Sequence, residues 1–415
     1  MPIQPRRVAQ LCCLLGMFAS VCAGQAPKRE SKSDDAAELL AKVQKYAAIL
    51  GEAQAALDNK KPEMARSRLL STDPKLRGWE FEHLLRKSKE ERVRWGLPGK
   101  LEGRVSQVKF ADNERVVLAR RGSEVESGEV SIWDFVNEKV TPLDFPPGYY
   151  VALAVSRDGN LIAAAGRTGK VTVWDVEKGK IVQQYSGHNP DPKITSTSKE
   201  FLRVGSLDFS PDGKRMVSGA VGVAGITKTH ALKVWSIETG KDLITVAGEH
   251  QEGKGRPISS VCFSPDGKTI ASGGFDGAIT LWDAESGKEL RKIRGPLINV
   301  PCLEFSPDGK RLACGSFNSA VWDVDSGKQL TRLNGYPKPV SSLAFSRDGK
   351  RLITGGWDRT VRIWDSDTGV ELMLLGTLKN RVSSVAISPD GKSIAAGGPE
   401  GRAIPVPTVW SHGTQ

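Results

Sequence analysis

Short apolar runs separated by turn residues dominate the hydrophobic pattern of this chain. The segment SPDGKTIASGGFDGAITLWD, residues 264–283, contains a tight turn, a short apolar run, a glycine-rich corner and a second run that ends in Trp-Asp. Gly, Pro, Asp and Ser spaced in this way between apolar runs predict antiparallel strands that fold back on one another. The chain has 415 residues, 44 glycines and 39% hydrophobic residues, which fits a large ordered β-rich domain.

The same marks recur along the chain. A turn of the form Ser-x-Asp-Gly begins at Ser156, Ser210, Ser264, Ser306, Ser346 and Ser388. A second mark, a strand-like run that ends in tryptophan, occurs at Trp133, Trp174, Trp235, Trp282, Trp322, Trp364 and Trp410. The intervals between these tryptophans are 41, 61, 47, 40, 42 and 46 residues, and most fit the ~40 to 45 residues of one four-stranded propeller blade.

These marks resemble the WD-repeat β-propeller family over residues 92–410, and the block RGWEFEHLLRK resembles the helical lead-in of some bacterial exported members. The resemblance implies an all-β fold: a seven-bladed β-propeller of four-stranded blades at residues 91–415, preceded by a short α-helical segment at residues 35–90. The last unit stops five residues after Trp410. We therefore expect residues 91–97 to supply its outer strand and to close the ring.

The resemblance also implies a hydrogen-bonded set inside each blade. It assigns a structural role to the seven tryptophans and to two corner aspartates, Asp276 and Asp358. Family members often place a Gly-His pair before the first strand of a blade. Here Gly187-His188 is the clearest match, whereas Gly335 is followed by Tyr336. We therefore expect blade rigidity to depend more on apolar packing between blades.

The N-terminus has the features of a secretory signal. Arg6 and Arg7 precede the apolar run at residues 8–23, which is shorter than the ~20 residues of a membrane-spanning helix. We expect cleavage after Ala23, export to the periplasm or the extracellular space, and no transmembrane anchor afterwards. A lipid anchor at Cys22 is the alternative. Residues 24–34 are expected to be a flexible leader.

Three helices are predicted before the propeller. Leu39, Val43, Tyr46, Leu50, Ala53 and Leu57 recur at helical spacing, and Pro62 and Pro74 stand where two shorter helices would begin. Three helices make a marginal core by themselves. We therefore expect Trp79, Phe81, Leu84 and Leu85 to dock on the propeller, with a helical spacer as the alternative.

Three cysteines, Cys262, Cys302 and Cys314, follow the predicted signal segment. Cys302 and Cys314 flank one SPDGK turn and could form a disulfide if the strand register allows it. Three buried thiols are the favoured interpretation.

The sequence contains few candidates for catalytic or metal-binding groups. It lacks a His-Glu-x-x-His pair, a Gly-x-Ser-x-Gly elbow, a phosphate loop and a Cys-x-x-Cys pair, and its five histidines have no helical ligand spacing. The repeated Asp-Gly pairs are better explained as turns than as calcium ligands. We expect no catalytic residue, no cofactor and no metal. The net charge is +11, but basic and acidic residues are interspersed, so nucleic acid is not an expected partner.

The expected binding surface is the top face of the propeller, where the loops are longest. Phe275, Phe317 and Trp357 precede the corners of blades 4 to 6, and the family resemblance places this position near the channel on that face. The candidate protein-binding residues are Phe275, Phe317, Trp357, Arg359, Tyr336, Lys338, His230 and His250. We expect an exported, monomeric, non-catalytic scaffold for a protein partner. The alternative is an exported propeller enzyme, a lactonase-like hydrolase or a quinone-dependent dehydrogenase.

Overall fold

The computed structural model describes residues 30–88, 94–96, 104–121, 128–166, 169–185, 188, 202–222, 230–247, 258–294, 299–398 and 408–411. The predicted signal segment and residues 24–29 of the predicted leader lie outside these ranges. Residues 1–41 and 42–415 form two separate units. The propeller and most of the helical segment belong to the second unit.

The helical segment contains α1 (Glu30–Asp58), α2 (Pro62–Leu70), the 3-10 turn η1 (Pro74–Leu76) and α3 (Trp79–Lys87). Pro62 and Pro74 occupy the first turns of α2 and η1, as the sequence predicts. Helix α1 begins at Glu30, so the predicted leader at residues 24–34 is helical from that point. Leu39 is exposed, and the buried face of α1 begins at Val43.

The strands form four-stranded antiparallel sheets. Blades 1 to 3 consist of β2 (Arg104–Phe110), β3 (Arg115–Arg121), β4 (Glu129–Asp134), β5 (Lys139–Pro142); β6 (Tyr150–Val155), β7 (Leu161–Gly166), β8 (Val171–Asp175), β9 (Lys180–Tyr185); and β10 (Leu202–Phe209), β11 (Arg215–Gly222), β12 (His230–Ser236), β13 (Asp242–Ala247). Blades 4 to 6 consist of β14 (Ile258–Phe263), β15 (Thr269–Gly274), β16 (Ala278–Asp283), β17 (Glu289–Arg294); β18 (Cys302–Phe305), β19 (Arg311–Gly315), β20 (Ala320–Asp323), β21 (Gln329–Arg332); and β22 (Val340–Phe345), β23 (Arg351–Gly356), β24 (Thr360–Asp365), β25 (Glu371–Thr377). The remaining sheet combines β1 (Arg94–Gly96) with β26 (Ser384–Ile387), β27 (Ser393–Gly397) and β28 (Thr408–Ser411).

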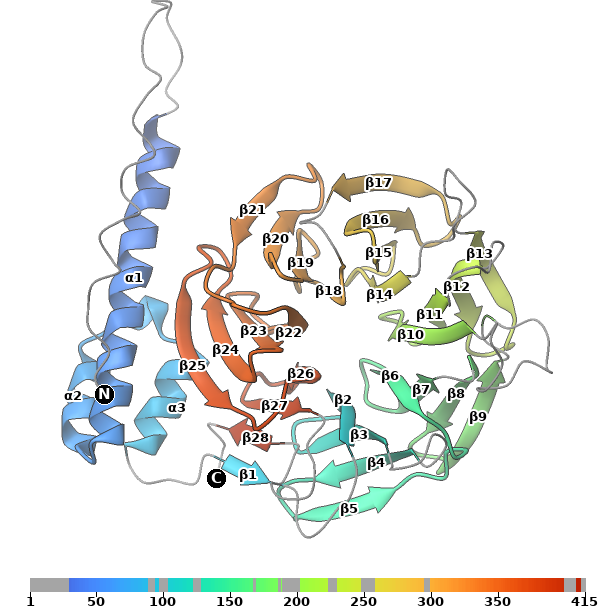
Figure 1. Ribbon diagram of the computed structural model, residues 1–415, viewed down its shortest axis with the longest axis horizontal. Helices are drawn as coiled ribbons and strands as arrows, with labels where there is room; N and C mark the ends of the chain where they lie inside the picture. Colours follow the sequence, from blue (N-terminus) through green and yellow to red (C-terminus); the bar gives the residue numbers. More distant parts are fainter. Residues whose placement is uncertain are drawn as a thin grey trace, which may run out of the picture. The chain divides into compact units, whose positions relative to one another are not determined.

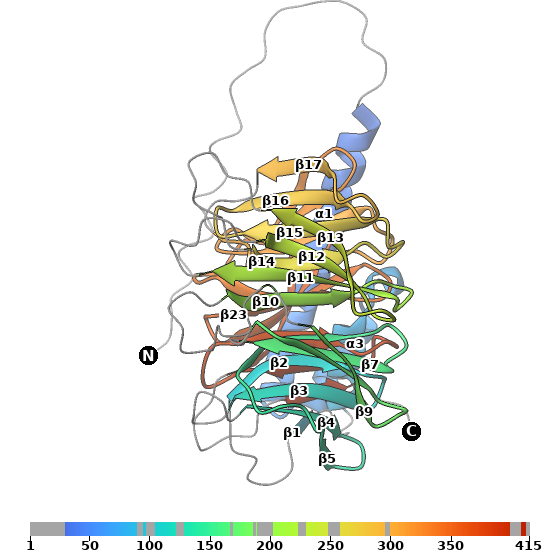
Figure 2. The ribbon, with the colours of Figure 1, turned by 90° about the vertical axis from the view of Figure 1, so that its right-hand side faces the viewer.

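The first strands of the sheets lie innermost in the ring (Figure 1), and the cavity lined by residues of these strands is the central channel. Each first strand contacts its neighbour in the order β2, β6, β10, β14, β18, β22, β26, and β26 contacts β2 again. Serine side chains link these strands. Ser384 of β26 accepts a hydrogen bond from the backbone N–H of Val108 in β2 at 3.1 Å, and Ser260 accepts one from Leu303 at 2.9 Å. Figure 2 shows the stacked sheets from the side.

The number of equivalent blades expected from the sequence needs correction. Six blades are complete units of four consecutive strands, whereas the remaining sheet is a composite of β26–β28 and the three-residue strand β1. Seven equivalent blades are therefore not formed. The short helical segment before the propeller is confirmed.

Each Ser-x-Asp-Gly turn is held by its own polar atoms. In blade 4 the Ser264 hydroxyl donates to the Asp266 carboxylate at 2.6 Å and accepts from the backbone N–H of Thr269 at 2.9 Å. Gly267 has a φ of 70°, a left-handed conformation that glycine adopts without a Cβ clash. The Ser264 hydrogen bond lowers the pKa of Asp266. The carboxylates of these aspartates form hydrogen bonds within their own turns, which agrees with the prediction that they are turn residues and not calcium ligands.

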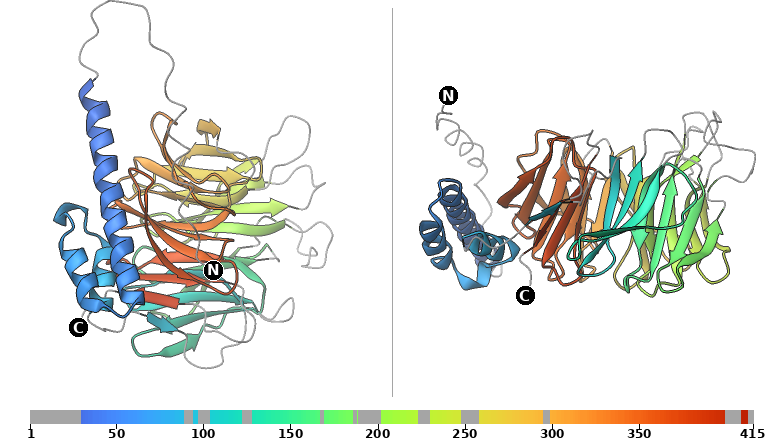
Figure 3. Two further views of the ribbon diagram at one scale, coloured as in Figure 1. Left: turned by 60° about the vertical axis from the view of Figure 1, so that its left-hand side comes forward. Right: turned by 90° about the horizontal axis from the view of Figure 1, so that it is seen from below.

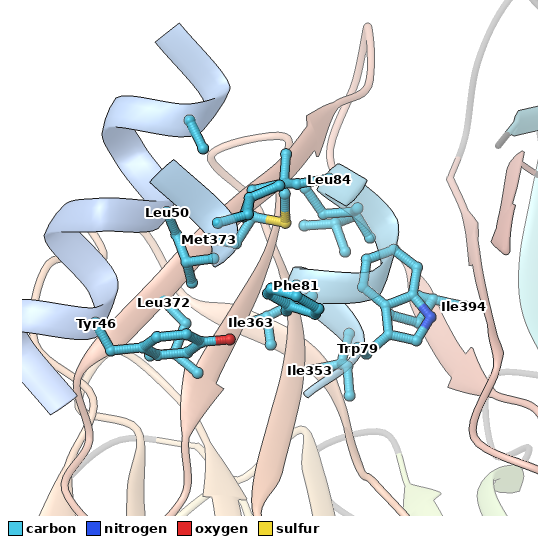
Figure 4. Packing of buried hydrophobic residues seen from close by; sticks show 14 of the residues in the cluster. Tyr46, Leu50, Trp79, Phe81, Leu84, Ile353, Ile363, Leu372, Met373 and Ile394 are labelled. Atoms are coloured by element: carbon cyan, nitrogen blue, oxygen red, sulfur yellow. The ribbon is translucent and has the colours of Figure 1, made fainter. Parts of the chain in front are cut away.

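The helices pack on blade 6, and Figure 3 shows α2 and α3 beside β25 from two directions. One apolar core joins Tyr46 and Leu50 of α1, Trp79, Phe81 and Leu84 of α3, and residues of β23 to β27. Figure 4 shows this packing around Ile353, Ile363 and Met373. The predicted docking of Trp79, Phe81 and Leu84 is confirmed, and Leu85 packs against the same core.

The outer strand of blade 6 provides an apolar surface on which the helices pack. Leu372 and Met373 of β25 are buried under them. The equivalent residues in blade 4 are Leu290, which is 57% exposed, and Arg291. Blades 4 and 5 follow this exposed leucine with polar residues, as in ELRK and QLTR, whereas β25 continues with Met373, Leu374 and Leu375 as a continuous apolar strip. Burial of that strip accounts for the choice of blade.

Candidate functional site

The tryptophans at the strand ends form the structural core of the blades. In blade 3 the Trp235 indole N–H donates to the Ser218 hydroxyl at 2.7 Å, and His188 Nε2 lies 2.9 Å from the same oxygen. His188 is therefore part of the hydrogen-bonded set that the family resemblance implies. Its ring is buried and is not available at the surface.

Blade 6 uses a tyrosine where blade 3 has its histidine. Trp364 donates to the Thr354 hydroxyl at 2.7 Å, and the Tyr336 hydroxyl contacts the same oxygen. The Tyr336 ring lies 5.5 Å from the Trp364 ring, and the Arg362 guanidinium stacks over it at 4.6 Å. Although Tyr336 was predicted as a binding residue, the structure places it in this structural set.

Other blades lack part of this set. Trp282 of blade 4 donates to Ser272 at 2.7 Å. In the described part of the chain, the indole N–H groups of Trp133 and Trp322 have no hydrogen-bond partner. Leu118 and Cys314 occupy the positions in these blades that Thr354 holds in blade 6. Trp174 is also buried, in blade 2, while the side chain of Trp410 lies outside the described residues.

The two corner aspartates hold their corners. The Asp276 carboxylate accepts from the backbone N–H of Ala278 at 3.2 Å. The Asp358 carboxylate accepts from the N–H of Thr360 at 3.1 Å and from Arg362 at 2.9 Å. This geometry fits the structural role assigned to both residues.

Three aromatic side chains are exposed at equivalent corners of successive blades. Phe275, Phe317 and Trp357 are 43%, 58% and 48% exposed, respectively. The second strands of these blades contain Ser272, Cys314 and Thr354 at equivalent positions. Each aromatic residue lies three residues further along the chain, in the corner that leads to the third strand. We call these three residues the aromatic arc. The sequence argument favoured exposure of these rings over packing between blades, and the structure agrees.

Cationic side chains accompany the aromatic arc. The Arg381 guanidinium lies 5.1 Å from the Trp357 ring centroid. Arg359, two residues after Trp357, is exposed and has a φ of 75°, and Lys338 is exposed as well. Arg381 was not among the predicted residues, because it lies on the link after β25 and its approach to Trp357 depends on the tertiary fold.

The remaining predicted binding residues cannot be assigned to this surface. His250 and most of the long loops at 189–201, 219–231 and 248–257 lie outside the described residues. His230 begins β12 and pairs with Ala247, and its side chain is likewise outside the description.

Charged side chains also line the central channel. Asp208 of β10 accepts from the backbone N–H of Phe263 in the next blade at 2.7 Å. Glu304 of β18 accepts from the N–H of Phe345 at 3.0 Å. Burial raises the pKa of Asp208 to about 6 and that of Glu304 to about 7, and the Lys109 ammonium opposes both shifts. The two carboxyl groups therefore titrate near neutral pH.

These pKa shifts predict a measurable pH dependence of stability. Since both pKa values are raised in the folded state, the carboxyl groups stabilise the fold below about pH 4, and this stabilisation is lost as the pH rises through 6 and 7. Compared with the parent, the variant Asp208→Asn, Glu304→Gln should gain roughly 4–5 kcal/mol in unfolding free energy between pH 4.5 and pH 8. Urea denaturation across this range measures the difference, with exposed Glu289→Gln as control. A difference that stays constant with pH would contradict the assignment.

The three cysteines are free thiols. Cys302 pairs with Gly315 and Leu303 pairs with Cys314 in the β18–β19 register. Adjacent residues of a strand point to opposite faces, so Cys302 and Cys314 face different neighbouring blades. Burial raises the pKa of the Cys314 thiol to about 12. The disulfide alternative is therefore not formed. The buried-thiol interpretation holds for Cys262 and Cys314, whereas Cys302 is half-buried.

The described residues provide few groups for metal chemistry. Within them, no group of three or more His, Cys, Asp or Glu side chains could hold a metal ion. The helices in the described ranges also lack a stretch long and apolar enough to cross a membrane.

Comparison with protein families identifies the repeat. Five segments match the profile of "WD domain, G-beta repeat": residues 144–175, 242–283, 287–323, 327–365 and 372–403. These five segments of the chain therefore resemble WD repeats. The matched segments include strands of blades 2 to 6 and of the composite sheet, and they end in or contain the core tryptophans of blades 2, 4, 5 and 6.

Several eukaryotic proteins resemble parts of this chain. It is 28% identical over 183 residues to the small ribosomal subunit protein RACK1y of rice, covering 43% of this chain and 48% of that protein. It is 27% identical over 148 residues to autophagy-related protein 16 of Arabidopsis thaliana, covering 36% and 24%. With the small ribosomal subunit protein RACK1 of Caenorhabditis elegans the identity is 25% over 186 residues, covering 43% and 50%. The chain thus spans half or less of each relative, and these relatives give no support to the expected bacterial exported type.

Proposed function

We propose that this protein is a non-catalytic scaffold that binds a protein partner through the aromatic arc on the WD-repeat propeller. The exposure of Phe275, Phe317 and Trp357 at equivalent corners of three successive blades carries this proposal. Large apolar side chains exposed on a rigid framework lose little conformational entropy on binding, and aromatic residues are enriched among binding hot spots. WD-repeat propellers typically serve in protein–protein interaction, which agrees with this use of the surface.

The charges around the aromatic arc specify the partner further. Arg359, Arg381 and Lys338 are exposed, whereas Asp358 is paired with Arg362. A partner surface that combines apolar side chains with Asp or Glu would complement this face. We therefore propose an acidic protein surface, and no nucleic acid, as the ligand of a monomeric propeller.

The proposed function includes export. Its basis is the sequence alone: Arg6 and Arg7, the apolar run at residues 8–23 and the small residues at its end. The scaffold would then act in the periplasm or outside the cell, after cleavage behind Ala23. Mass spectrometry of the N-terminal peptide of the native protein tests this part, and a peptide that includes residues 1–23 would refute it.

A pair of variants in blade 5 tests the binding surface. Phe317→Ala should reduce capture of a partner from the native extract at least tenfold, because it removes a 58% exposed ring from the aromatic arc. Leu330→Ala is the control, since Leu330 is 52% exposed on β21 of the same blade but lies outside the arc. Both variants should keep the parental thermal midpoint. Equal capture by the Phe317 variant and the parent would refute the proposed surface.

A further inference from the structure

A cavity of about 450 Å³ lies among the first strands of the blades. Its lining comes from blades 1 to 6, and it extends from Ser259 and Ser341 at one end of these strands to Pro211 and Pro265 at the turns of the other end. The cavity therefore follows the central channel. It is separate from the corners that carry the aromatic arc.

One layer of this channel is charged. The residue two places before each blade turn is Lys109, Ala154, Asp208, Cys262, Glu304, Ala344 and Ala386 in the order of the blades. Lys109, Asp208, Cys262 and Glu304 line the cavity. The three charged residues of this layer come from three different blades.

The charged groups are positioned but not paired with one another. Backbone N–H groups of the following blades anchor both carboxylates, as described above. Among the described residues, Lys109, Asp208 and Glu304 form no ion pair within 4 Å. Lys109 nevertheless acts electrostatically on both carboxylates, so the three groups share one region of the channel. Arg157 adds a second cation to the lining, from the blade 2 turn.

We propose that this channel binds a small zwitterion, with the ligand ammonium between Asp208 and Glu304 and the ligand carboxylate toward Lys109 and Arg157. Two cations and two carboxylates in the lining match a ligand that carries both charges and no net charge. A simple anion would be repelled by the carboxylates, and a simple amine would leave Lys109 unmatched. A concave site with a few convergent charged groups provides this kind of orientation.

L-Alanine is the minimal probe, and its two halves provide matched controls. Ethylamine lacks the carboxylate and propionate lacks the ammonium, so each can satisfy one side of the site only. Titration calorimetry on the full chain should show L-alanine binding at least tenfold more tightly than either control. If ethylamine bound as tightly as L-alanine, the site would be one for amines, and if propionate did, it would be one for anions. If L-alanine binding were undetectable, the channel would not hold this ligand. Each of these outcomes overturns the proposal.

Three variants place the probe in the channel. Asp208→Asn, Glu304→Gln and Lys109→Met should each weaken L-alanine binding at least tenfold, while Glu289→Gln on the outer strand β17 should leave it unchanged. The amide replacements keep oxygen acceptors for the N–H groups of Phe263 and Phe345, and the thermal midpoint reports whether each variant is folded. Parental affinity in folded variants would refute the site.

The parent protein provides a test that needs no substitution. L-Alanine remains a zwitterion between pH 5.5 and pH 8, whereas Asp208 and Glu304 become protonated as the pH falls in this range. Lys109, Arg157 and Cys262 also line the cavity, and the buried Cys262 thiol stays protonated because burial raises its pKa. Affinity should therefore fall severalfold from pH 8 to pH 5.5. An affinity independent of pH would contradict the role of the carboxylates.

Discussion

Replacement of Trp364 by alanine should lower the unfolding free energy by about 3–5 kcal/mol, as truncation of large buried aromatic residues does. The indole is fully buried in blade 6, its N–H donates to Thr354, and Tyr336 packs on its ring. The change would leave a cavity and remove one member of the hydrogen-bonded set. Chemical denaturation followed by circular dichroism measures the loss.

Trp357 provides the matched control within the same blade. It lies seven residues earlier and is 48% exposed, so Trp357→Ala should change the unfolding free energy by no more than about 0.5 kcal/mol. A second comparison isolates the hydrogen bond. Trp364→Phe should cost about 1 kcal/mol more than Trp322→Phe, because Trp322 has no hydrogen-bond partner for its indole N–H among the described residues. Equal losses for Trp364→Ala and Trp357→Ala would show that the assignment of core and surface rings is wrong.

Replacement of Glu80 by alanine should destabilise the protein by about 3–5 kcal/mol, the usual cost of leaving one partner of a buried ion pair behind. The Glu80 carboxylate accepts from the Tyr46 hydroxyl at 2.8 Å and from the Arg351 guanidinium at 2.8 Å. Glu80 is fully buried between α3 and blade 6, so its loss would leave Asp365, at 3.4 Å, as the remaining carboxylate partner of the buried Arg351 guanidinium. Thermal and urea unfolding of the full chain measure the effect.

Glu82, two residues further along α3 and exposed, is the control position, and Glu82→Ala should remain near the parental stability. A double variant separates the charge from the packing. Glu80→Leu with Arg351→Met removes both charges and should recover much of the stability lost on removal of Glu80 alone. If Glu80→Ala behaved like Glu82→Ala, the helical segment would not be anchored to blade 6 through this ion pair.

The blade interiors were the most predictable part of this protein. A Ser-x-Asp-Gly turn closes through bonds among its own residues, so its local sequence specifies its conformation wherever it occurs. The exposure of Phe275, Phe317 and Trp357 followed from their place in the same repeat. The role of Tyr336 beside Trp364 was harder to predict, because Tyr336 takes a place for which the family pattern supplies a histidine.

The sequence by itself determined the repeated blades, the turns that close them and the aromatic corner positions, since each depends on residues near one another in the chain. The tertiary structure decided which blade receives the helices, how Glu80 meets Arg351, and which charged residues share the channel. Glu80 and Arg351 are 271 residues apart, and Lys109, Asp208 and Glu304 come from three blades. Interactions of this kind arise only when the ring closes and separate strands are brought into one layer, so no local pattern reveals them.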